Sequence, residues 1–165
     1  MNLLHLDTPF GTLAIGATGG KLLICDWTHS PHFASHTQKL RGIENDYKLA
    51  REVAAQVREY LAGHRKTFTV QLAPIGTPFQ QQVWMELGKI PYGHTDTYSS
   101  IARRIGKPQG ARCVANAIGR NPISIIIPCH RIIGADGTLT GYAGGTDAKA
   151  SLLALEKSAC GASHS

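Results

Sequence analysis

The first part of the chain alternates short apolar runs with turn residues. Three such runs stand at residues 2–6, 11–15 and 21–27, and the segments between them contain Thr-Pro and Thr-Gly-Gly. Short apolar runs bounded by glycine and proline are typical of β-strands. The pattern therefore predicts a small sheet at the start of the chain. The polar residues 28–45 show no clean period and predict a loop.

The next apolar positions recur at the spacing of a helix. Over residues 46–63 they lie about 100° apart per residue and share one face; they are Leu49, Val53, Ala54, Val57, Tyr60 and Leu61. We expect this helix to pack on the sheet, and one more strand at residues 67–72. The linker Ala-Pro-Ile-Gly places a domain boundary near Gly76. The expected domains are residues 1–76 and residues 77–165.

From residue 77 the pattern becomes helical. The segment Thr77-Pro-Phe-Gln80 matches a capping box with proline at the first helical position, which predicts the start of a helix. A short helix is expected at residues 98–105, where Gly106 ends it, and another at residues 110–118. Two short helices joined across Gly-Lys-Pro-Gln have the length and turn chemistry of a helix-turn-helix.

The helix expected at residues 110–118 has two chemically different faces. At about 100° per residue, one face carries Ala111, Val114, Ala115 and Ile118, and the other carries Arg112, Cys113 and Asn116. The second face holds short groups and a single long cation, so it suits a close approach to DNA. An exposed helix that happens to carry short residues would show the same pattern.

Composition describes an ordinary globular chain. The 165 residues are 42% hydrophobic and 17% charged. No run approaches the ~18 apolar residues of a membrane span, and the N-terminus lacks the layout of a secretory signal, so we expect a cytoplasmic protein. The four cysteines form no Cys-x-x-Cys pair and are expected to be free thiols; they are Cys25, Cys113, Cys129 and Cys160.

The net charge of +6 is concentrated in the second half of the chain. Residues 1–76 hold eight Lys and Arg against six Asp and Glu, a balance of +2, whereas residues 77–165 hold nine against five, a balance of +4. Residues 97–135 contain no acid; their cations are Arg103, Arg104, Lys107, Arg112, Arg120 and Arg131. Such a field attracts a polyanion, nucleic acid above all, although a solvated basic face is the other interpretation.

The candidate chemistry lies within this basic stretch. Residues 123–128 are a β-branched run that ends in proline, which predicts a buried strand with Cys129 at its end. His130 and Arg131 flank the cysteine in a region without acids, and such surroundings favour thiolate over thiol. We therefore favour a nucleophile over an inert buried cysteine. Because neighbours on a strand point to opposite faces, His130 would reach the sulfur only if the chain turns, or through a water.

A third partner is expected on the final helix, residues 147–157. Glu156 projects between Leu152 and Leu153, on the apolar stripe of that helix. A buried carboxylate needs a hydrogen-bonded partner, and the imidazole of His130 is a natural one. Together with the cysteine they would form a nucleophile, a base and a group that orients the base. A surface glutamate at a frayed helix end is the alternative.

These residues resemble those of the O6-alkylguanine-DNA alkyltransferases, or methylated-DNA–protein-cysteine methyltransferases. The segment Ile127-Pro-Cys-His-Arg131 is similar to the active-site signature of that family, Asn121-Pro122 to its hinge, and Gly141-Tyr-Ala-Gly-Gly145 to a motif that follows. The resemblance is strong over residues 77–157 and extends to residues 1–76 only in general layout. It implies an α+β fold: a small N-terminal antiparallel sheet with a helix, ribonuclease-H-like, followed by a mainly α C-terminal domain of winged or helix-turn-helix type.

The resemblance implies a role for each catalytic residue. Cys129 would be the alkyl acceptor, His130 the base that deprotonates it through a water, and Glu156 the residue that completes this relay. Tyr98 would hydrogen-bond the guanine and donate toward the leaving base, and Asn121 would be the hinge asparagine.

The resemblance also implies how DNA is bound. O6 of guanine is buried in the duplex, so the base must be flipped out before a sulfur reaches its alkyl group. Arg112 would be the finger that fills the vacated space. The expected DNA-binding residues, which would enter the minor groove of double-stranded DNA, are Arg112, Cys113, Asn116, Arg120 and Arg131. The expected substrate pocket is formed by Tyr98, Ile132, Tyr142, Ala143 and Gly144.

Two departures from relatives affect what is expected. Some relatives have serine where this chain has Ala143, which leaves the tolerated size of the alkyl group open. Some carry zinc in the N-terminal domain, but the candidate ligands here lack the paired spacing of a metal site; they are His5, Cys25, His29, His32 and His36. We expect no metal, no cofactor and a monomer.

The implied reaction is an in-line displacement that leaves a thioether on Cys129, with O6-alkylguanine and also O4-alkylthymine as substrates. The sequence indicates no second thiol or cofactor that would reverse a thioether, so one turnover per molecule is expected.

Three other functions are the alternatives to alkyl transfer. A non-catalytic sensor of alkylated DNA would lack the cysteine. A cysteine hydrolase leaves the helix-turn-helix unused, and a helix-turn-helix regulator leaves the surroundings of Cys129 unused. Only an alkyltransferase uses both.

Overall fold

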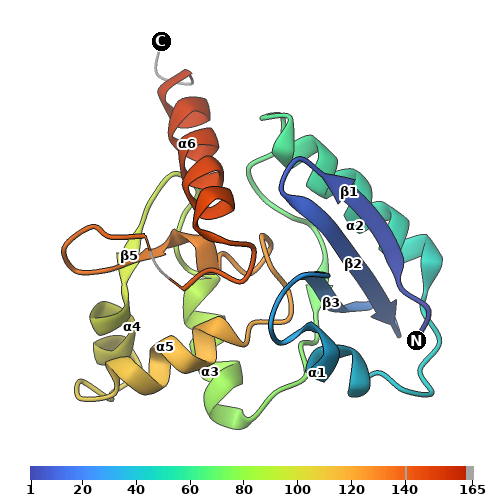
Figure 1. The fold of residues 1–165 in the computed structure, drawn as a ribbon, viewed down its shortest axis with the longest axis horizontal. Coiled ribbons are helices and arrows are strands. Elements are labelled where there is room, and N and C mark those ends of the chain that lie inside the picture. The colour runs from blue at the N-terminus through green and yellow to red at the C-terminus, as the bar shows by residue number, and fades with distance from the viewer. Residues whose placement is uncertain (140, 163–165) are drawn as a thin grey trace.

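The apolar runs of the first part form a sheet of strand order β1-β2-β3-β4 (Figure 1). The computed structural model describes residues 1–139 and 141–162. Its strands are β1 (Leu4–Thr8), β2 (Gly11–Thr18), β3 (Lys21–Trp27), β4 (Gln71–Leu72), β5 (Asp96–Thr97) and β6 (Ile132–Ile133). Its helices are α1 (Phe33–Gln38), α2 (Tyr47–Leu61), α3 (Pro78–Leu87), α4 (Tyr98–Arg104), α5 (Ala111–Gly119) and α6 (Thr146–Ala162). The fold is α+β, as expected.

The sheet is mixed, which corrects the expectation of an antiparallel one. Strands β1, β2 and β3 pair antiparallel, but β4 pairs parallel with β3. The strand expected at residues 67–72 is only two residues long, because side chains hold the backbone of the preceding segment. Gln56 accepts a hydrogen bond from the Thr69 backbone N–H at 3.0 Å, and Arg65 donates to the Thr67 carbonyl at 3.0 Å.

Helix α2 forms where the apolar period predicts it and packs on the sheet (Figure 1). The Asp46 side chain caps its start by accepting from the Leu49 backbone N–H at 3.2 Å. The loop expected at residues 28–45 is wrong in part, since α1 lies within it. Contacts to other segments hold this helix in place through the buried His36 ring. Its Nδ1 contacts Asp26 at 2.8 Å, and its Nε2 contacts the Arg120 carbonyl at 2.9 Å. Periodicity along the chain carries no sign of such contacts.

The helices of the second half follow their local signals. Both hydrogen bonds of the capping box form at the start of α3, between Thr77 and Gln80. Helices α4 and α5 lie next to each other in the chain and pack together. On α5 the face expected to be inward contains the buried Val114 and Ile118, and the other face is exposed: Arg112, Cys113 and Asn116.

The strand expected at residues 123–128 is wrong, because this segment is a folded loop. The Asn121 side chain accepts from the Ile123 N–H at 2.9 Å and donates to the carbonyls of Ile123 and Ile127 at 3.1 and 3.0 Å. These bonds close the loop on itself, and Ile125 adopts a φ of 70°, which is rare for a β-branched residue. Only Ile123 pairs with the sheet, by a single bridge to Cys25. The loop delivers Cys129 to a 3-10 turn, Cys129–Arg131.

One apolar core joins the two halves of the chain. Its buried members include Trp27 and Val57 from the first half, and Trp84, Ile101 and Leu152 from the second. Helix α6 follows in the second half (Figure 1) and carries Glu156, one of the residues expected at the site. Among the residues described, no helix is both long and apolar enough to span a membrane.

Candidate active site

Cys129 lies at the first position of the turn that follows the closed loop. It is 6% exposed, and its backbone N–H donates to the Ile127 carbonyl at 2.7 Å. The tight turn places His130 and Arg131 on the same side as the last helix, which an extended strand would not do. The chain therefore turns at the cysteine, as a direct approach of His130 to the sulfur would require.

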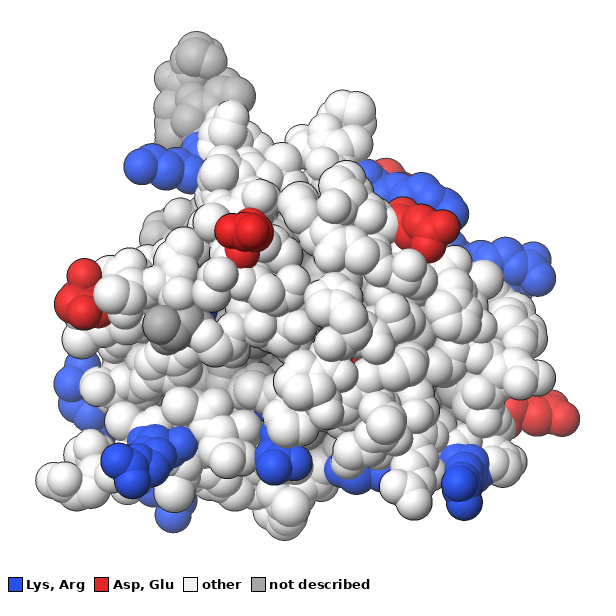
Figure 2. Space-filling model, in the orientation of Figure 1, with Lys and Arg blue, Asp and Glu red and all other residues white. Residues whose placement is uncertain are grey.

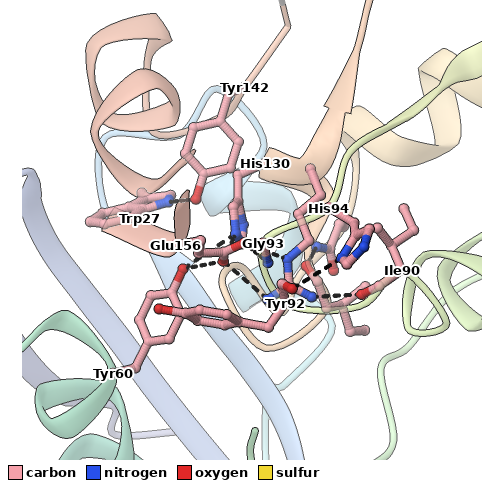
Figure 3. A network of polar contacts seen from close by, with 12 residues as sticks. Trp27, Tyr60, Ile90, Tyr92, Gly93, His94, His130, Tyr142 and Glu156 are labelled. Atoms are coloured by element: carbon pink, nitrogen blue, oxygen red, sulfur yellow. Dashed lines mark hydrogen bonds and ion pairs between the residues drawn. The ribbon is translucent and has the colours of Figure 1, made fainter. Parts of the chain in front are cut away.

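Glu156 is the hub of the polar network beside this turn (Figure 3). It is 0% exposed, as expected for a residue on the buried stripe of the last helix. Its carboxylate accepts hydrogen bonds from Tyr60 Oη at 2.5 Å, His130 Nε2 at 2.6 Å, Arg131 Nε and Nη2 at 2.8 and 3.0 Å, and the Gly93 N–H at 3.2 Å. A buried carboxylate is stable only with such a set of donors.

The donors keep Glu156 ionised. Burial alone would raise the pKa of its carboxyl group, but the hydrogen bonds from His130 and Arg131 outweigh burial and lower that pKa to about 2. The alternative of a surface glutamate is therefore wrong.

His130 is held as a neutral base. Since Nε2 faces a carboxylate, that nitrogen carries the hydrogen and donates it. Burial lowers the pKa of His130 below its ordinary value, against the opposing effect of Glu156. Within the described part of the chain, the buried Nδ1 has no hydrogen-bond partner. The lone pair of the imidazole is thus on Nδ1 and is available to accept a proton.

The thiol of Cys129 is protonated in this arrangement, which corrects the expectation that its surroundings favour thiolate. Burial raises the pKa of the thiol to about 11, although a hydrogen bond with Asn121 and the charge of Lys149 lower it. The two residues expected to favour the thiolate supply no net positive charge, because His130 is neutral and the Arg131 charge is neutralised by Glu156. A thiolate at this position requires a base.

Arg131 does not belong to the DNA-binding face, which is a second correction. Its side chain is 9% exposed and pairs with Glu156, while Nη1 donates to the Ile90 carbonyl at 2.7 Å. The guanidinium also lies 5.7 Å from the centre of the Tyr92 ring. Its charge is therefore directed into the protein, toward Glu156.

Tyr142 covers the other side of His130. Its buried ring meets the His130 ring edge-on at 6.3 Å between centroids, and its hydroxyl accepts from Trp27 Nε1 at 3.2 Å (Figure 3). Gly144 packs closely here, since a Cβ at this position would lie 2.8 Å from Trp27 Nε1. Of the other expected pocket residues, Tyr98 and Ala143 are half-buried, whereas Ile132 is fully buried in β6. The Tyr98 hydroxyl lies near Gly141, 3.4 Å from where a Cβ would be.

The remaining expected DNA-binding residues lie on the exposed face of α5 or at its end. Arg112, Cys113, Asn116 and Arg120 are exposed, and Arg120 Nε donates to Asn116 Oδ1 at 3.1 Å. Figure 2 shows lysine and arginine side chains along the lower edge of the molecule, where α4, α5 and α1 lie in Figure 1, with no acidic side chain between them in that view.

Three residues at the site were not expected from the sequence. Tyr60 and Trp27 come from α2 and β3, far from the motif in sequence, and the helical period gives Tyr60 only a buried position. Lys149, which is 1% exposed on α6, looks like any lysine in a surface helix. Of the thiols, Cys25, Cys113 and Cys129 are free, and the Cys160 side chain lies outside the described part. Among described residues, no group of three or more His, Cys, Asp or Glu is placed to hold a metal ion.

A buried cysteine, a neutral histidine and an ionised glutamate, in a chain with exposed arginines on and just after α5, fit the class of thiol-dependent enzymes that act on a polyanion. A sequence profile described as "6-O-methylguanine DNA methyltransferase, DNA binding domain" matches residues 78–158. A methylated-DNA–protein-cysteine methyltransferase of Methanosarcina acetivorans is 54% identical over 116 residues, 70% of this chain and 74% of the relative. That of Mycobacterium leprae is 41% identical over 155 residues, 92% of this chain and 90% of the relative.

The fold gives the same assignment. The crystal structure of Mycobacterium tuberculosis OGT in complex with DNA superimposes with a TM-score of 0.79 at 39% identity, over 94% of this chain and 92% of that one. The chain belongs to the family of methylated-DNA–protein-cysteine methyltransferases.

Proposed function

We propose that this protein repairs DNA by a single transfer of a methyl or other small alkyl group from O6-alkylguanine in duplex DNA to Cys129. The observation that carries the proposal is the hydrogen bond from His130 Nε2 to Glu156 at 2.6 Å, which leaves the buried Nδ1 as an acceptor in the residue next to Cys129. The Cys129 thiol is protonated in this arrangement. Attack of the cysteine sulfur on an alkyl carbon needs a thiolate, and a neutral histidine is suited to make one.

The proposed reaction moves one proton and one alkyl group. His130 Nδ1 takes the proton of the Cys129 thiol through a water, and the imidazolium is stabilised by Glu156. The thiolate then attacks the alkyl carbon in line with the C–O6 bond. The S–C bond forms, the C–O6 bond breaks, and its electron pair leaves with guanine, which takes up a proton. Tyr98 is the proposed donor toward the leaving base, and the proton taken up by His130 returns to the tyrosine through solvent. A thioether remains on Cys129, so the protein acts once.

We further propose that α4 and α5 act as a helix-turn-helix that enters the minor groove. The exposed face of α5 carries the short side chains of Cys113 and Asn116 with the long side chain of Arg112. The complex of the M. tuberculosis protein with DNA supports DNA as the partner. In this arrangement Arg112 replaces the flipped base in the stack, while Asn116, Cys113 and Arg120 face the DNA backbone.

Residues 1–76 then form the structural domain and residues 77–165 the DNA-binding domain. O4-alkylthymine is a second proposed substrate. We expect a monomer, and a DNA substrate favours the expected cytoplasmic location.

The proposed substrate pocket is the space beside Cys129 bounded by Tyr142, Ala143, Gly144 and Tyr98. Tyr142 forms one wall of the proposed pocket, and a hydrogen bond from Trp27 Nε1 holds its hydroxyl in place. Ile132 is fully buried, and we expect it to support the pocket floor. Asn121 acts here as the hinge that fixes the loop before Cys129.

The deciding experiment mixes the protein with duplex DNA that carries one O6-methylguanine. We expect a methyl-sized mass increase on the peptide that contains Cys129, at most one group per molecule, and none in Cys129→Ser. Cys160→Ser, which removes a cysteine to which no role is assigned, is the matched control for thiol content. No mass gain in the wild-type protein, or an equal gain in Cys129→Ser, would refute the proposal. A non-catalytic sensor would bind the DNA that carries O6-methylguanine without any increase in mass.

Arg112→Ala should slow transfer from duplex DNA about tenfold or more, because an unfilled gap in the base stack disfavours the flipped state by a few kcal/mol. The rate with the free base O6-methylguanine, which needs no flipping, should change less than about twofold on the same reasoning. Both rates are measured in single-turnover reactions. Arg51→Ala removes the same charge from the exposed side of α2 and is the control. Equal slowing with both substrates would contradict the finger role.

A further inference from the structure

Helix α2 of the first half places one side chain inside the catalytic network. Tyr60 is 0% exposed. Its hydroxyl donates to Glu156 Oε2 at 2.5 Å and lies 3.3 Å from His130 Nε2 (Figure 3). Every residue to which the family resemblance assigns a role lies between Tyr98 and Glu156, so Tyr60 is additional to that set.

The ring of Tyr60 is held from several directions. It packs against Phe68 at 5.6 Å between centroids, and it meets Tyr92 and His130 edge-on at 6.1 and 6.5 Å. Side chains packed in this way keep one rotamer. The hydroxyl is therefore presented to the carboxylate at a fixed point, which makes it suited to orient Glu156.

The hydroxyl also sets how the carboxylate acts on the base. Burial, with the negative charge of Glu156, raises the pKa of Tyr60 far above its ordinary range, so Tyr60 is a permanent donor. Oε2 receives three donors, from Tyr60, His130 and Arg131. Each donor reduces the negative charge left for His130. With one donor fewer, Glu156 would hold a proton on His130 more strongly.

We propose that Tyr60 is a positioning residue of the alkyl transfer, through which the first half of the chain tunes the base. It fixes Glu156 so that His130 keeps its hydrogen on Nε2 and its lone pair on Nδ1. This inference rests on the proposed function, since it concerns the base of that reaction. Its consequence is that the first half is part of the active site and does more than stabilise the fold.

The test removes only the hydroxyl, in Tyr60→Phe of the full-length protein. We expect single-turnover transfer to slow about tenfold or more, because hydrogen bonds to charged groups are among the strong ones. The slowing should be equal with duplex DNA and with free O6-methylguanine, while the affinity for unmodified duplex DNA stays unchanged. Tyr47→Phe removes a hydroxyl from the exposed start of the same helix and should leave the rates as they are.

The pH profile separates positioning from a purely structural role. The groups around His130 are Cys129 and Arg131 in its own turn, Lys149 and Glu156 on α6, Tyr60 on α2 and Tyr142 before α6. Transfer requires neutral His130, so the rate falls on the acid side of its pKa. Loss of the Tyr60 donor should raise that pKa and move this acid limb to higher pH. A uniform loss of rate with the limb unmoved, or no loss at all, would overturn the proposal.

The role of Tyr60 can also be tested without alkyl transfer, by NMR of the His130 ring. This test remains valid if the proposed function is wrong. The ¹⁵N resonances of the His130 ring report its tautomer and its titration. We expect the Nε2–H tautomer in the wild-type protein and an upward shift of the titration in Tyr60→Phe. An identical titration in both proteins would refute the role of Tyr60, whereas absent transfer with the expected shift would refute only the proposed reaction.

Discussion

Glu156→Gln should lose both stability and activity, more than any other conservative change at the site. The wild-type carboxylate accepts from Tyr60, His130, Arg131 and the Gly93 N–H. Glutamine has the same shape but replaces one acceptor oxygen with an amide donor, which faces groups that are themselves donors. It also leaves the buried Arg131 charge unpaired. We expect the free energy of unfolding to fall by about 3–5 kcal/mol, measured by urea denaturation.

The same change should slow alkyl transfer about 100-fold or more, the usual contribution of a positioned base. Without the carboxylate, His130 loses the partner that fixes its tautomer, and the Cys129 thiol, whose pKa burial raises to about 11, keeps its proton. Single-turnover transfer from duplex DNA measures this effect at a temperature where the variant is folded.

Glu59→Gln is the matched control. Glu59 is half exposed on α2 and pairs with Arg65 at 3.1 Å. An exposed pair contributes about 0–1 kcal/mol, so this variant should transfer normally and unfold almost like the wild-type protein. If Glu156→Gln behaved like Glu59→Gln, the description of Glu156 as a buried hub would be wrong.

The sequence predicts the elements whose signals are local. The apolar period of α2, the Thr77 capping box and the period of α5 each depend on residues within one or two helical turns. The buried stripe of the last helix is also local, which is why Glu156 could be identified before the structure. The motif around Cys129 could also be identified from the sequence, because its residues are contiguous.

Features built from distant contacts could not be predicted. Helix α1 depends on His36 reaching Asp26 and Arg120. The isoleucine run at residues 123–128 indicates burial correctly, but it does not distinguish a strand from a loop closed by a side chain. Arg131 looks like a DNA contact in a stretch without acids, because its acidic partner follows 25 residues later. The contribution of Tyr60 has no local signal at all.

Asn121→Ala should disrupt the loop that carries Cys129. The Asn121 side chain makes hydrogen bonds to the Ile123 N–H and to the carbonyls of Ile123 and Ile127, all buried. Alanine would leave these backbone groups without their partner, and each such group costs about 1–3 kcal/mol. The loop also holds Ile125 at a φ of 70°, a conformation that persists only when the surroundings enforce it. We therefore expect the free energy of unfolding to fall by about 3 kcal/mol or more.

Transfer should slow beyond what the lost stability explains. Asn121 lowers the pKa of the Cys129 thiol by a hydrogen bond, so its removal makes the thiolate harder to form. The acid limb set by His130 should stay in place, in contrast to Tyr60→Phe, since Asn121 acts on the sulfur. Asn2→Ala removes an exposed amide side chain and should change neither stability nor rate. If Asn121→Ala kept the wild-type rate, cysteine reactivity would not depend on the closed loop, and the hinge role would have to be abandoned.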